Sequence, residues 1–485
     1  MRRFCPWPVV LAFTLPLLSQ AATFSVTSTA DSGAGSLRQA LIDAGTDTTY
    51  PRVIQFNAPF PVGGVIELQT TLPTWSNDIL KIEGNGRAPV LDGRNAVRIL
   101  TVAAGTREIT LRGLTFQRGR TTTGVGGCLW YSSPATGTDL LVYESRFEGC
   151  KAVANQGNAY GGAIAWFSAG STTFIDNSIF EGNSIGVVGN SNRRDMFGGA
   201  VALNGQRVNI TSTRFSDNVA ERVGGVVQGL GGAAYAATTS LALLKNVEFE
   251  SNRVIDADAD GALSAGGAAV VACLESECLL DITNVGFIDN NVSGETIGGG
   301  ALVSQGGRLA MLNVSFSGNR ANDGAGGALF ALAPGELGAR HLSFTGNQAA
   351  IGANLALSGV EVTEWAWSLF GPTAAGSGTS CALESIVLTG PTSANLFEST
   401  CGVLSASGGS IGPTGSLALD RSVFPATLAP AYGSPAIDPA LGQELCITYD
   451  ARGMPRPQDG DGDGIALCDV GAYEAPVRIF ANGFD

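Results

Sequence analysis

The chain carries short apolar runs separated by glycine, asparagine and serine, and this pattern is most regular between Gly126 and Asn347. The runs are three to five residues long and rich in apolar or β-branched residues, as at 163–166, 208–211 and 309–312. Runs of this length, bounded by turn-forming residues, predict β-strands and are too short for helices. We therefore expect an all-β segment built from many short strands.

Two short signatures alternate through this segment. One is Gly-Gly followed by a small residue and then apolar residues, and it begins at Gly126, Gly161, Gly198, Gly231, Gly266, Gly299 and Gly326. The other is Phe-x-x-Asn, which begins at Phe180, Phe215, Phe249, Phe287, Phe316 and Phe344, with a variant from Phe147 to Cys150. Successive Phe residues lie 28 to 38 positions apart, and a period of this length with β-type residues predicts a solenoid of stacked coils.

The position three residues before each Phe favours residues that tolerate a left-handed backbone. It holds Gly113, Glu144, Asn177, Ser212, Asn246, Asn284, Asn313 and His341. Since Gly, Asn and His adopt positive φ more readily than most residues, we expect a tight turn between the second and third strands of each coil. Asn side chains here, and those that end Phe-x-x-Asn, should hydrogen-bond from coil to coil. The Phe rings should stack in the interior at the inter-strand spacing of about 4.8 Å.

One arc of each coil is nearly constant in length and the other is variable. The count from Gly-Gly to Phe is 17 to 21 residues, whereas the count from Phe to the next Gly-Gly is 10 to 18. Because insertions must leave a stacked core, we expect a long edge of projecting loops between Lys151 and Asp323. The variable segments contain Lys151, Arg193, Arg194, Asp195, Glu221, Arg222, Arg253, Asp256, Asp258, Asp260, Glu295, Arg320 and Asp323. We expect this edge to contact any macromolecular ligand; the alternative is that its loops merely tolerate drift.

The two signatures together resemble a known family. Gly-Gly-Ala-(Ile/Leu/Val) alternating with Phe-x-x-Asn is similar to the repeats of chlamydial polymorphic outer membrane proteins and related adhesins. The resemblance implies a single-stranded right-handed parallel β-helix, the pectin-lyase-like solenoid, which we expect to be regular over residues 101–375. That fold is found in both adhesins and carbohydrate-active enzymes, so it does not by itself imply an activity.

The first residues have the features of a secretory signal peptide. Residues 1–21 begin with Arg2 and Arg3, continue with a short apolar run, and end with small residues at a cleavage site. No later run reaches the roughly 18 apolar residues of a spanning helix, so we expect no membrane span after the signal is removed. An extracellular or cell-surface location follows from these features.

Residues 22–100 should form an N-terminal cap and the first, irregular coils. Leu37, Ala40, Leu41 and Ala44 share one helical face, so we expect a short helix that covers the exposed edge of the first coil. The segment resembles the "CSLREA"-type start of secreted bacterial β-helix proteins, with Gly35 in place of the Cys.

Residues 376–475 should contain the last coils and a C-terminal module. Three blocks, at 433–438, 450–457 and 468–474, occur in the order found in "choice-of-anchor Q" modules of secreted bacterial β-helix proteins, which they resemble. The tail, 476–485, resembles the "IFxxGFE"-type ending of exported bacterial proteins, and this likeness implies a role in export or anchoring.

Eight cysteines remain after Cys5 leaves with the signal peptide. An even number in an exported protein favours disulfides. The repeat alignment brings the start and end of one coil together and predicts the pairs Cys128–Cys150, Cys273–Cys278, Cys381–Cys401 and Cys446–Cys468. Metal binding is the alternative, but no Cys-x-x-Cys spacing and no accompanying His support it.

The charge of the chain excludes one class of partner. The net charge is −14, and it becomes −16 when the signal peptide takes two arginines away. An acidic chain without a basic aromatic patch is not expected to bind nucleic acid. It also disfavours anionic glycans unless a cation bridges the two.

Two acidic runs are candidate Ca²⁺ ligands. Asp459, Asp461 and Asp463 alternate with glycine, and alternate carboxylates on a turning loop can converge on one ion. The run departs from an EF-hand because Val470 takes the position of the last ligand, and the alternative is an acidic loop held by Cys446–Cys468. A second run, which has the same form and weaker support, contains Asp256, Asp258 and Asp260.

Other candidates for chemistry have structural explanations. His341, the only histidine, occupies the turn position, and no Ser or Cys accompanies it in a triad arrangement. Trp365 and Trp367 could stack on a sugar but are more typical of packing at the end of a core. Asp217 and Asp289, both two residues after a Phe, are the best carboxylate pair for glycan hydrolysis, yet Asp is common beside turns.

We therefore assign no catalytic residue from the sequence. The pattern predicts a secreted or surface-associated β-helix that acts as an adhesin-like binding scaffold, with a glycan or a surface protein of a host or neighbouring cell as partner. The alternative is a polysaccharide lyase or glycoside hydrolase of the same fold. The strands lack the carboxylate and base cluster that a lyase would need.

Overall fold

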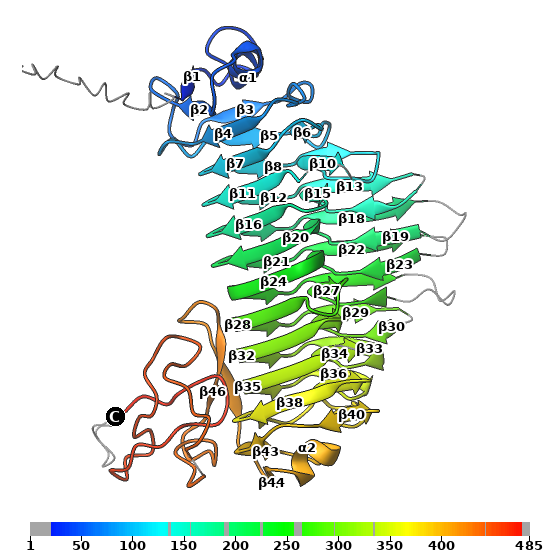
Figure 1. Ribbon diagram of the computed structural model, residues 1–485, viewed down its shortest axis with the longest axis vertical. Coiled ribbons are helices and arrows are strands. Elements are labelled where there is room, and N and C mark those ends of the chain that lie inside the picture. The colour runs from blue at the N-terminus through cyan, green and yellow to red at the C-terminus, as the bar shows by residue number, and fades with distance from the viewer. Residues whose placement is uncertain are drawn as a thin grey trace, which may run out of the picture.

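A computed structural model describes residues 21–477, apart from 134–136, 156, 189–193, 224–226, 257–263, 295, 333–334 and 442. The expected signal peptide and most of the C-terminal tail lie outside these residues. The chain forms a right-handed parallel β-helix of about 11 turns, as the repeat pattern predicts. Figure 1 shows the coils stacked into one elongated column.

Each regular coil contributes to three ladders of parallel strands. The first ladder follows Gly-Gly and contains β6 (Leu100–Val102), β10 (Leu129–Ser133), β15 (Ile164–Ser168), the starts of β20 (Val201–Thr211) and β24 (Ala234–Glu250), β27 (Ala269–Cys273), β31 (Leu302–Gln305), β34 (Leu329–Leu332), β37 (Leu355–Ser358) and β40 (Cys381–Glu384).

The second ladder contains β1 (Ala22–Val26), β2 (Arg52–Phe56), β4 (Ile79–Glu83), β7 (Glu108–Arg112), β11 (Asp139–Tyr143), β16 (Thr172–Asp176), later parts of β20 and β24, β28 (Leu279–Ile288), β32 (Arg308–Ser317), β35 (Glu336–Thr345), β38 (Glu361–Ala366), β41 (Val387–Leu388) and β42 (Thr392–Ser393).

The third ladder carries the Phe residues. It contains β3 (Val65–Glu67), β5 (Val90–Asp92), β8 (Thr115–Gln117), β12 (Arg146–Glu148), β17 (Ile179–Glu181), β21 (Arg214–Ser216), the ends of β24, β28, β32 and β35, then β39 (Leu369–Phe370), β43 (Asn395–Phe397) and β44 (Gly409–Ile411).

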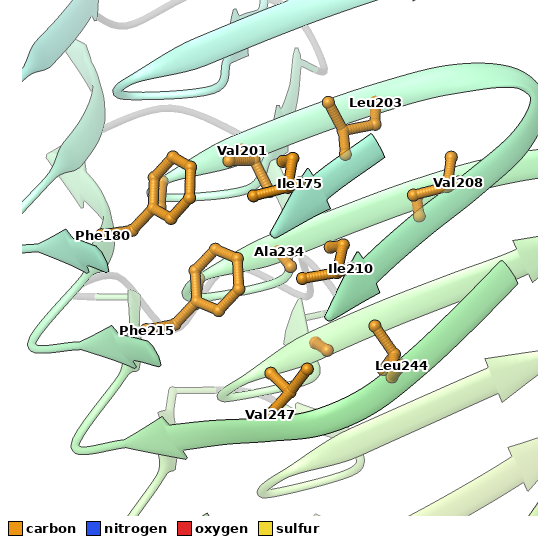
Figure 2. Close-up of a cluster of buried hydrophobic side chains, with 14 of the residues drawn as sticks. Ile175, Phe180, Val201, Leu203, Val208, Ile210, Phe215, Ala234, Leu244 and Val247 are labelled. Atoms are coloured by element: carbon orange, nitrogen blue, oxygen red, sulfur yellow. The ribbon is translucent and has the colours of Figure 1, made fainter. Parts of the chain in front are cut away.

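The Phe rings form the predicted interior stack. It runs without a break from Phe116 to Phe397, and neighbouring ring centroids lie 4.6 to 5.2 Å apart. Figure 2 shows Phe180 above Phe215, with Ile175, Val201 and Ile210 beside them in the core. The spacing equals one coil, so the aromatic stack and the strand ladders support the same register.

The Asn residues that end Phe-x-x-Asn form a second continuous column, the asparagine spine. Its members are Asn183, Asn218, Asn252, Asn290, Asn319 and Asn347, all fully buried. At Asn252, Nδ2 donates to Asn290 Oδ1 and to the Phe215 carbonyl, both at 3.0 Å. Its own Oδ1 accepts from the backbone N–H and side-chain amide of Asn218. The coil-to-coil Asn ladder predicted here is confirmed.

The turn position is also as predicted. All eight residues from Gly113 to His341 have positive φ, between 47° and 64°. Among the described residues, side-chain hydrogen bonds between coils at this turn position join Asn246, Asn284 and Asn313, so the ladder at this turn is shorter than the spine.

Helices close both ends of the stack. The helix α1 (Leu37–Thr46) buries Leu37, Ala40, Leu41 and Ala44, and the Ser36 hydroxyl caps its first turn. The expected capping helix is therefore confirmed. The short helix α2 (Gly402–Ala406) lies at the opposite end beside β44. All four predicted disulfides are present, with Cα separations of 5.0 to 6.2 Å.

The variable segments project at one corner, as expected, but the prediction that they are loops is wrong. They form two further ladders, which we call the fin (Figure 1). The outgoing strands are β9 (Arg120–Thr121), β13 (Lys151–Ala154), β18 (Ser184–Val188), β22 (Val219–Val223), β25 (Arg253–Asp256), β29 (Asn291–Ser293), β33 (Arg320–Ala325) and β36 (Gln348–Ile351). The returning strands are β14 (Ala159–Tyr160), β19 (Arg194–Phe197), β23 (Val227–Leu230), β26 (Ser264–Ala265) and β30 (Thr296–Gly298). A second small core, which includes Ala152, Ala154, Ile185, Val187 and Met196, holds the fin together.

Removal of one spine amide should destabilise the whole stack. We expect Asn252→Ala to lower the free energy of unfolding by at least about 2 kcal/mol, because it removes the acceptor of the buried Asn218 N–H and one hydrogen bond each from the Phe215 carbonyl and the Asn218 and Asn290 side chains. Denaturant unfolding followed by circular dichroism measures this change. Asn204→Ala is the control, because Asn204 is half-buried and its side chain makes no hydrogen bond in the described residues. Equal stability of the two variants would contradict the role of the spine.

Candidate functional site

A groove of about 430 Å³ runs along the base of the fin, where the third ladder gives way to the outgoing strands. We call it the fin groove, and it is lined by Asp217, Ser251, Arg253, Asp289, Asn291, Gly318 and Arg320. The lining is polar, and its two aspartates and two arginines are all exposed. The groove spans four successive coils.

The asparagine spine places every residue of this groove. Each lining residue directly precedes or follows a spine residue, as Ser251 and Arg253 flank Asn252. The preceding residues Asp217, Ser251 and Asp289 have φ of 52° to 56°, a turn that directs the chain out of the coil into the fin. The aspartates and arginines were predicted from the sequence, whereas Ser251 and Asn291 were not. Their position beside the repeated Asn was the signal that could have identified them.

The electrostatics of the groove are mixed. No ion pair joins its two aspartates to its two arginines within the part of the chain that the structure describes. Burial raises the pKa of Asp289, and Glu250 adds to the rise, whereas Arg421 and Arg320 oppose it. Arg421 itself comes from the C-terminal module and forms an ion pair with Glu250. The charged side chains of the groove therefore remain available to a ligand.

Asp217 and Asp289, the candidate hydrolytic pair, do line one groove. They lie two coils apart, which corresponds to about 10 Å between strands. This separation is at the upper limit for the two carboxylates of an inverting glycosidase.

The C-terminal module does not continue the stack. After β44 the chain turns back and lies along the outer face of the third ladder, where Figure 1 shows β46 (Thr427–Pro430) beside β28, β32 and β35. The strand β46 pairs in antiparallel fashion with β45 (Leu417–Asp420). The segment that enters β46 contacts the coils through the Ala426 N–H, which donates to Glu248 Oε2 at 2.8 Å, and through the Thr427 hydroxyl, which bonds to that of Ser315 at 2.9 Å. This face of the ladder is therefore covered.

Small residues on the coils allow this close contact. The outward positions at Gly286, Ser315 and Ser343 succeed one another along the third ladder. A Cβ atom at Gly286 would lie 2.7 Å from the Ala426 carbonyl oxygen. The Ser343 hydroxyl accepts from the Ala472 N–H at 2.9 Å.

The three sequence blocks of the C-terminal module meet in one buried polar centre. Arg456, from the second block, donates to Glu474 Oε2 at 2.9 Å and to the Asp469 and Gly471 carbonyls, all in the third block. Asp469 in turn accepts from the backbone of Asp438 in the first block at 2.8 Å. Burial, together with the Glu474 carboxylate, raises the pKa of Asp469 to about 8. The centre holds the module together rather than facing a ligand, since its charged groups are buried.

The acidic loop is fixed by Asp438, which the sequence did not indicate as a metal ligand. The Asp438 carboxylate accepts from the backbone N–H groups of Gly460, Asp461 and Leu467 at 2.6 to 3.0 Å. Oxygen atoms of Asp438, Asp459 and Asp461 lie within 4.8 Å of one another. Asp463, the third residue expected, is outside this group and accepts from the Ile465 N–H instead. Its place at the end of the first block of the module was the sequence feature that could have identified Asp438 as a ligand candidate.

The remaining candidates are structural or lie outside the description. Trp365 and Trp367 are fully buried, as end-of-core packing predicts, and Trp367 stacks on His341 at 5.8 Å. Burial holds the pKa of His341 well below its usual range, and its Nδ1 meets the Gly471 carbonyl oxygen. Asp258 and Asp260, together with the side chain of Asp256, lie outside the described residues, so the second Ca²⁺ prediction stays a prediction.

The contact at Gly286 can be tested by substitution. We expect Gly286→Ala to displace the C-terminal module, because the added methyl group would overlap the Ala426 carbonyl oxygen. Limited proteolysis should then cut residues 412–477 faster than in the unaltered protein. Gly338→Ala is the matched control, since the nearest atom to its added Cβ would be Thr363 Oγ1 at 3.8 Å. Unchanged protection in Gly286→Ala would contradict this contact.

No family model matches the chain, and searches of curated proteins and of solved structures find no match either. Among the described residues, no helix has the length and apolar character to cross a membrane.

Proposed function

We propose that the protein is an exported binding scaffold that holds a glycan chain along the fin groove. The observation that carries this proposal is the groove itself, in which exposed Asp, Arg, Asn and Ser side chains from successive coils are presented along one line. Carboxylates accept hydrogen bonds from sugar hydroxyl groups, and guanidinium and amide groups donate to them. A linear, repeated polar surface therefore suits a linear, hydroxyl-rich polymer.

The location proposed for the protein fits such a ligand. Four disulfides favour an oxidising compartment outside the cytoplasm, and the expected signal peptide would deliver the chain there. The adhesin-like repeats also lead us to expect a location outside the cytoplasm. A surface protein of a host or neighbouring cell is the other partner class, which a binding screen separates from a glycan.

The groove also supports a second candidate, glycoside hydrolysis. Asp289, with its raised pKa, has the character of a general acid, and Asp217 lines the same groove as a candidate base. Against this candidate, both carboxylates are exposed, whereas a general acid is usually tuned in a more enclosed site. We therefore rank binding first.

A glycan array followed by titration tests both candidates. We expect Arg253→Gln and Asp289→Asn each to weaken binding of the best array ligand about tenfold or more, since each removes a charge-assisted hydrogen bond. Arg308→Gln, which removes an exposed charge from the second ladder, should leave the affinity unchanged. Binding of cell-surface proteins alone, or equal affinity in all variants, would contradict the glycan groove. Release of new reducing ends that Asp289→Asn abolishes would favour the hydrolase.

We also propose that the acidic loop binds Ca²⁺ as a structural ion. The carboxylates of Asp438, Asp459 and Asp461 are hard oxygen ligands close enough to share one ion, which would relieve their mutual repulsion. The residues fit the ion without Asp463. Calcium bound only to the folded chain would stabilise it by mass action.

Removal of calcium should lower the melting temperature. We expect a chelator to reduce the melting temperature of the unaltered protein and to have no effect on Asp461→Ala. Asp463→Asn is the control and should keep its response to the chelator. An unchanged melting curve for the unaltered protein with and without chelator would exclude a structural calcium ion.

A further inference from the structure

A second groove, which the proposed function does not use, lies at the N-terminal end of the fin. It has a volume of about 390 Å³, and its lining includes Arg98, Arg120 and the side chains of Thr121, Thr122 and Thr123. Arg120 begins the column of outgoing-strand residues that continues through Lys151 towards Arg253. Like the fin groove, it is lined by two arginines, but its lining contains no acidic residue.

Arg98 is a half-buried cation that forms no ion pair with any residue the structure describes. Its Nε donates to the Gly126 carbonyl at 2.8 Å, and its Nη2 donates to the Val125 carbonyl at 2.6 Å and to the Thr121 and Thr123 hydroxyls at 3.2 Å. All four partners are neutral oxygens. Burial lowers its pKa to about 10, and no carboxylate offsets that effect. The cost of desolvating this cation is therefore only partly compensated within the chain.

One nitrogen of Arg98 is left for a ligand. Nη1 of Arg98 donates no hydrogen bond to any residue that the structure describes. It is not one of the fully buried polar atoms, so solvent can reach it. The four bonds to Nε and Nη2 hold the guanidinium plane fixed, which prepares Nη1 for a directional contact.

Neighbouring acids are already engaged. Asp92, the last residue of β5 in the preceding coil, is fully buried and forms an ion pair with Arg118. Asp31 pairs with Arg38 at 2.7 Å. Arg120 is exposed and forms no ion pair among the described residues, and its N–H donates to the Val97 carbonyl at 2.9 Å, next to Arg98. Two unpaired arginines thus meet at one pocket of an otherwise acidic protein.

We propose that this pocket binds an oxyanion group, a carboxylate, sulfate or phosphate carried by an extracellular ligand. Arg98 and Arg120 would supply the charge, and the Thr122 hydroxyl would supply a further donor. Paired arginines with hydroxyl groups are a common recognition set for such groups, because the guanidinium fork matches two oxyanion oxygens. The proposal does not depend on the fin groove, which lies several coils away.

Titration of the mature protein with three probes tests the pocket. The probes are a sulfated, a phosphorylated and a uronate oligosaccharide, measured by calorimetry at two salt concentrations. We expect at least one to bind, with an affinity that falls as salt rises. Arg120→Gln should weaken that binding at least tenfold without a change in melting temperature, because its side chain is exposed. Arg98→Gln should abolish binding, with folding checked by circular dichroism.

Arg308→Gln is the control, since it removes an exposed charge that lines neither groove and should leave oxyanion binding unchanged. That result, with loss in Arg120→Gln, supports the pocket. The source of the oxyanion follows from which probe binds. Failure of all three probes to bind, or equal losses in Arg120→Gln and Arg308→Gln, would overturn the proposal.

Discussion

The hydrogen bonds between one spine asparagine and the next set the register on which the rest of this molecule depends. In a parallel stack, the backbone ladders alone allow neighbouring coils to slip by two residues without reversing the faces of the strands. A buried amide has two donors and an acceptor that all need partners, so a slipped coil would leave several of them unpaired. The spine amides bond both to the next amide and to the Phe carbonyl of the preceding coil, and only one register satisfies both. The stacked Phe rings fill the space beside them.

This register also sets the position of the candidate binding grooves. The residues that flank each spine amide emerge at the base of the fin, so side chains from separate coils, such as Asp217, Arg253 and Asp289, fall on one line. Variation at these flanking positions changes the charge of the surface without disturbing the core. The same corner therefore presents a mixed groove near Arg253 and a cationic pocket near Arg120. The outer face of the third ladder has small residues instead at Gly286, Ser315 and Ser343 and is covered by the C-terminal module.

The regular part of the fold could be predicted because its causes are local and repeated. The Phe period, the left-handed turn, the capping helix and the four disulfides all follow from residue type and alignment. The fin was missed because strands of two to six residues, many of them with Ala or Gly, resemble loops until their neighbours in the stack are present. The return of the C-terminal module depends on contacts such as Ala426 with Glu248, which are 178 residues apart. Asp438 and Arg98 were missed for the same reason, since their partners come from other segments of the chain.

Amide hydrogen exchange, resolved by residue, tests the central claim most directly. The backbone N–H groups of Asn183, Asn218, Asn252, Asn290 and Asn319 each donate to the side chain of the next spine residue. If the spine holds the register, these five amides should exchange as slowly as the most protected amides of the strand ladders, although they lie at a corner where the chain leaves the coil. Exchange of these amides near the rate of an unfolded chain, with the strands still protected, would contradict the account.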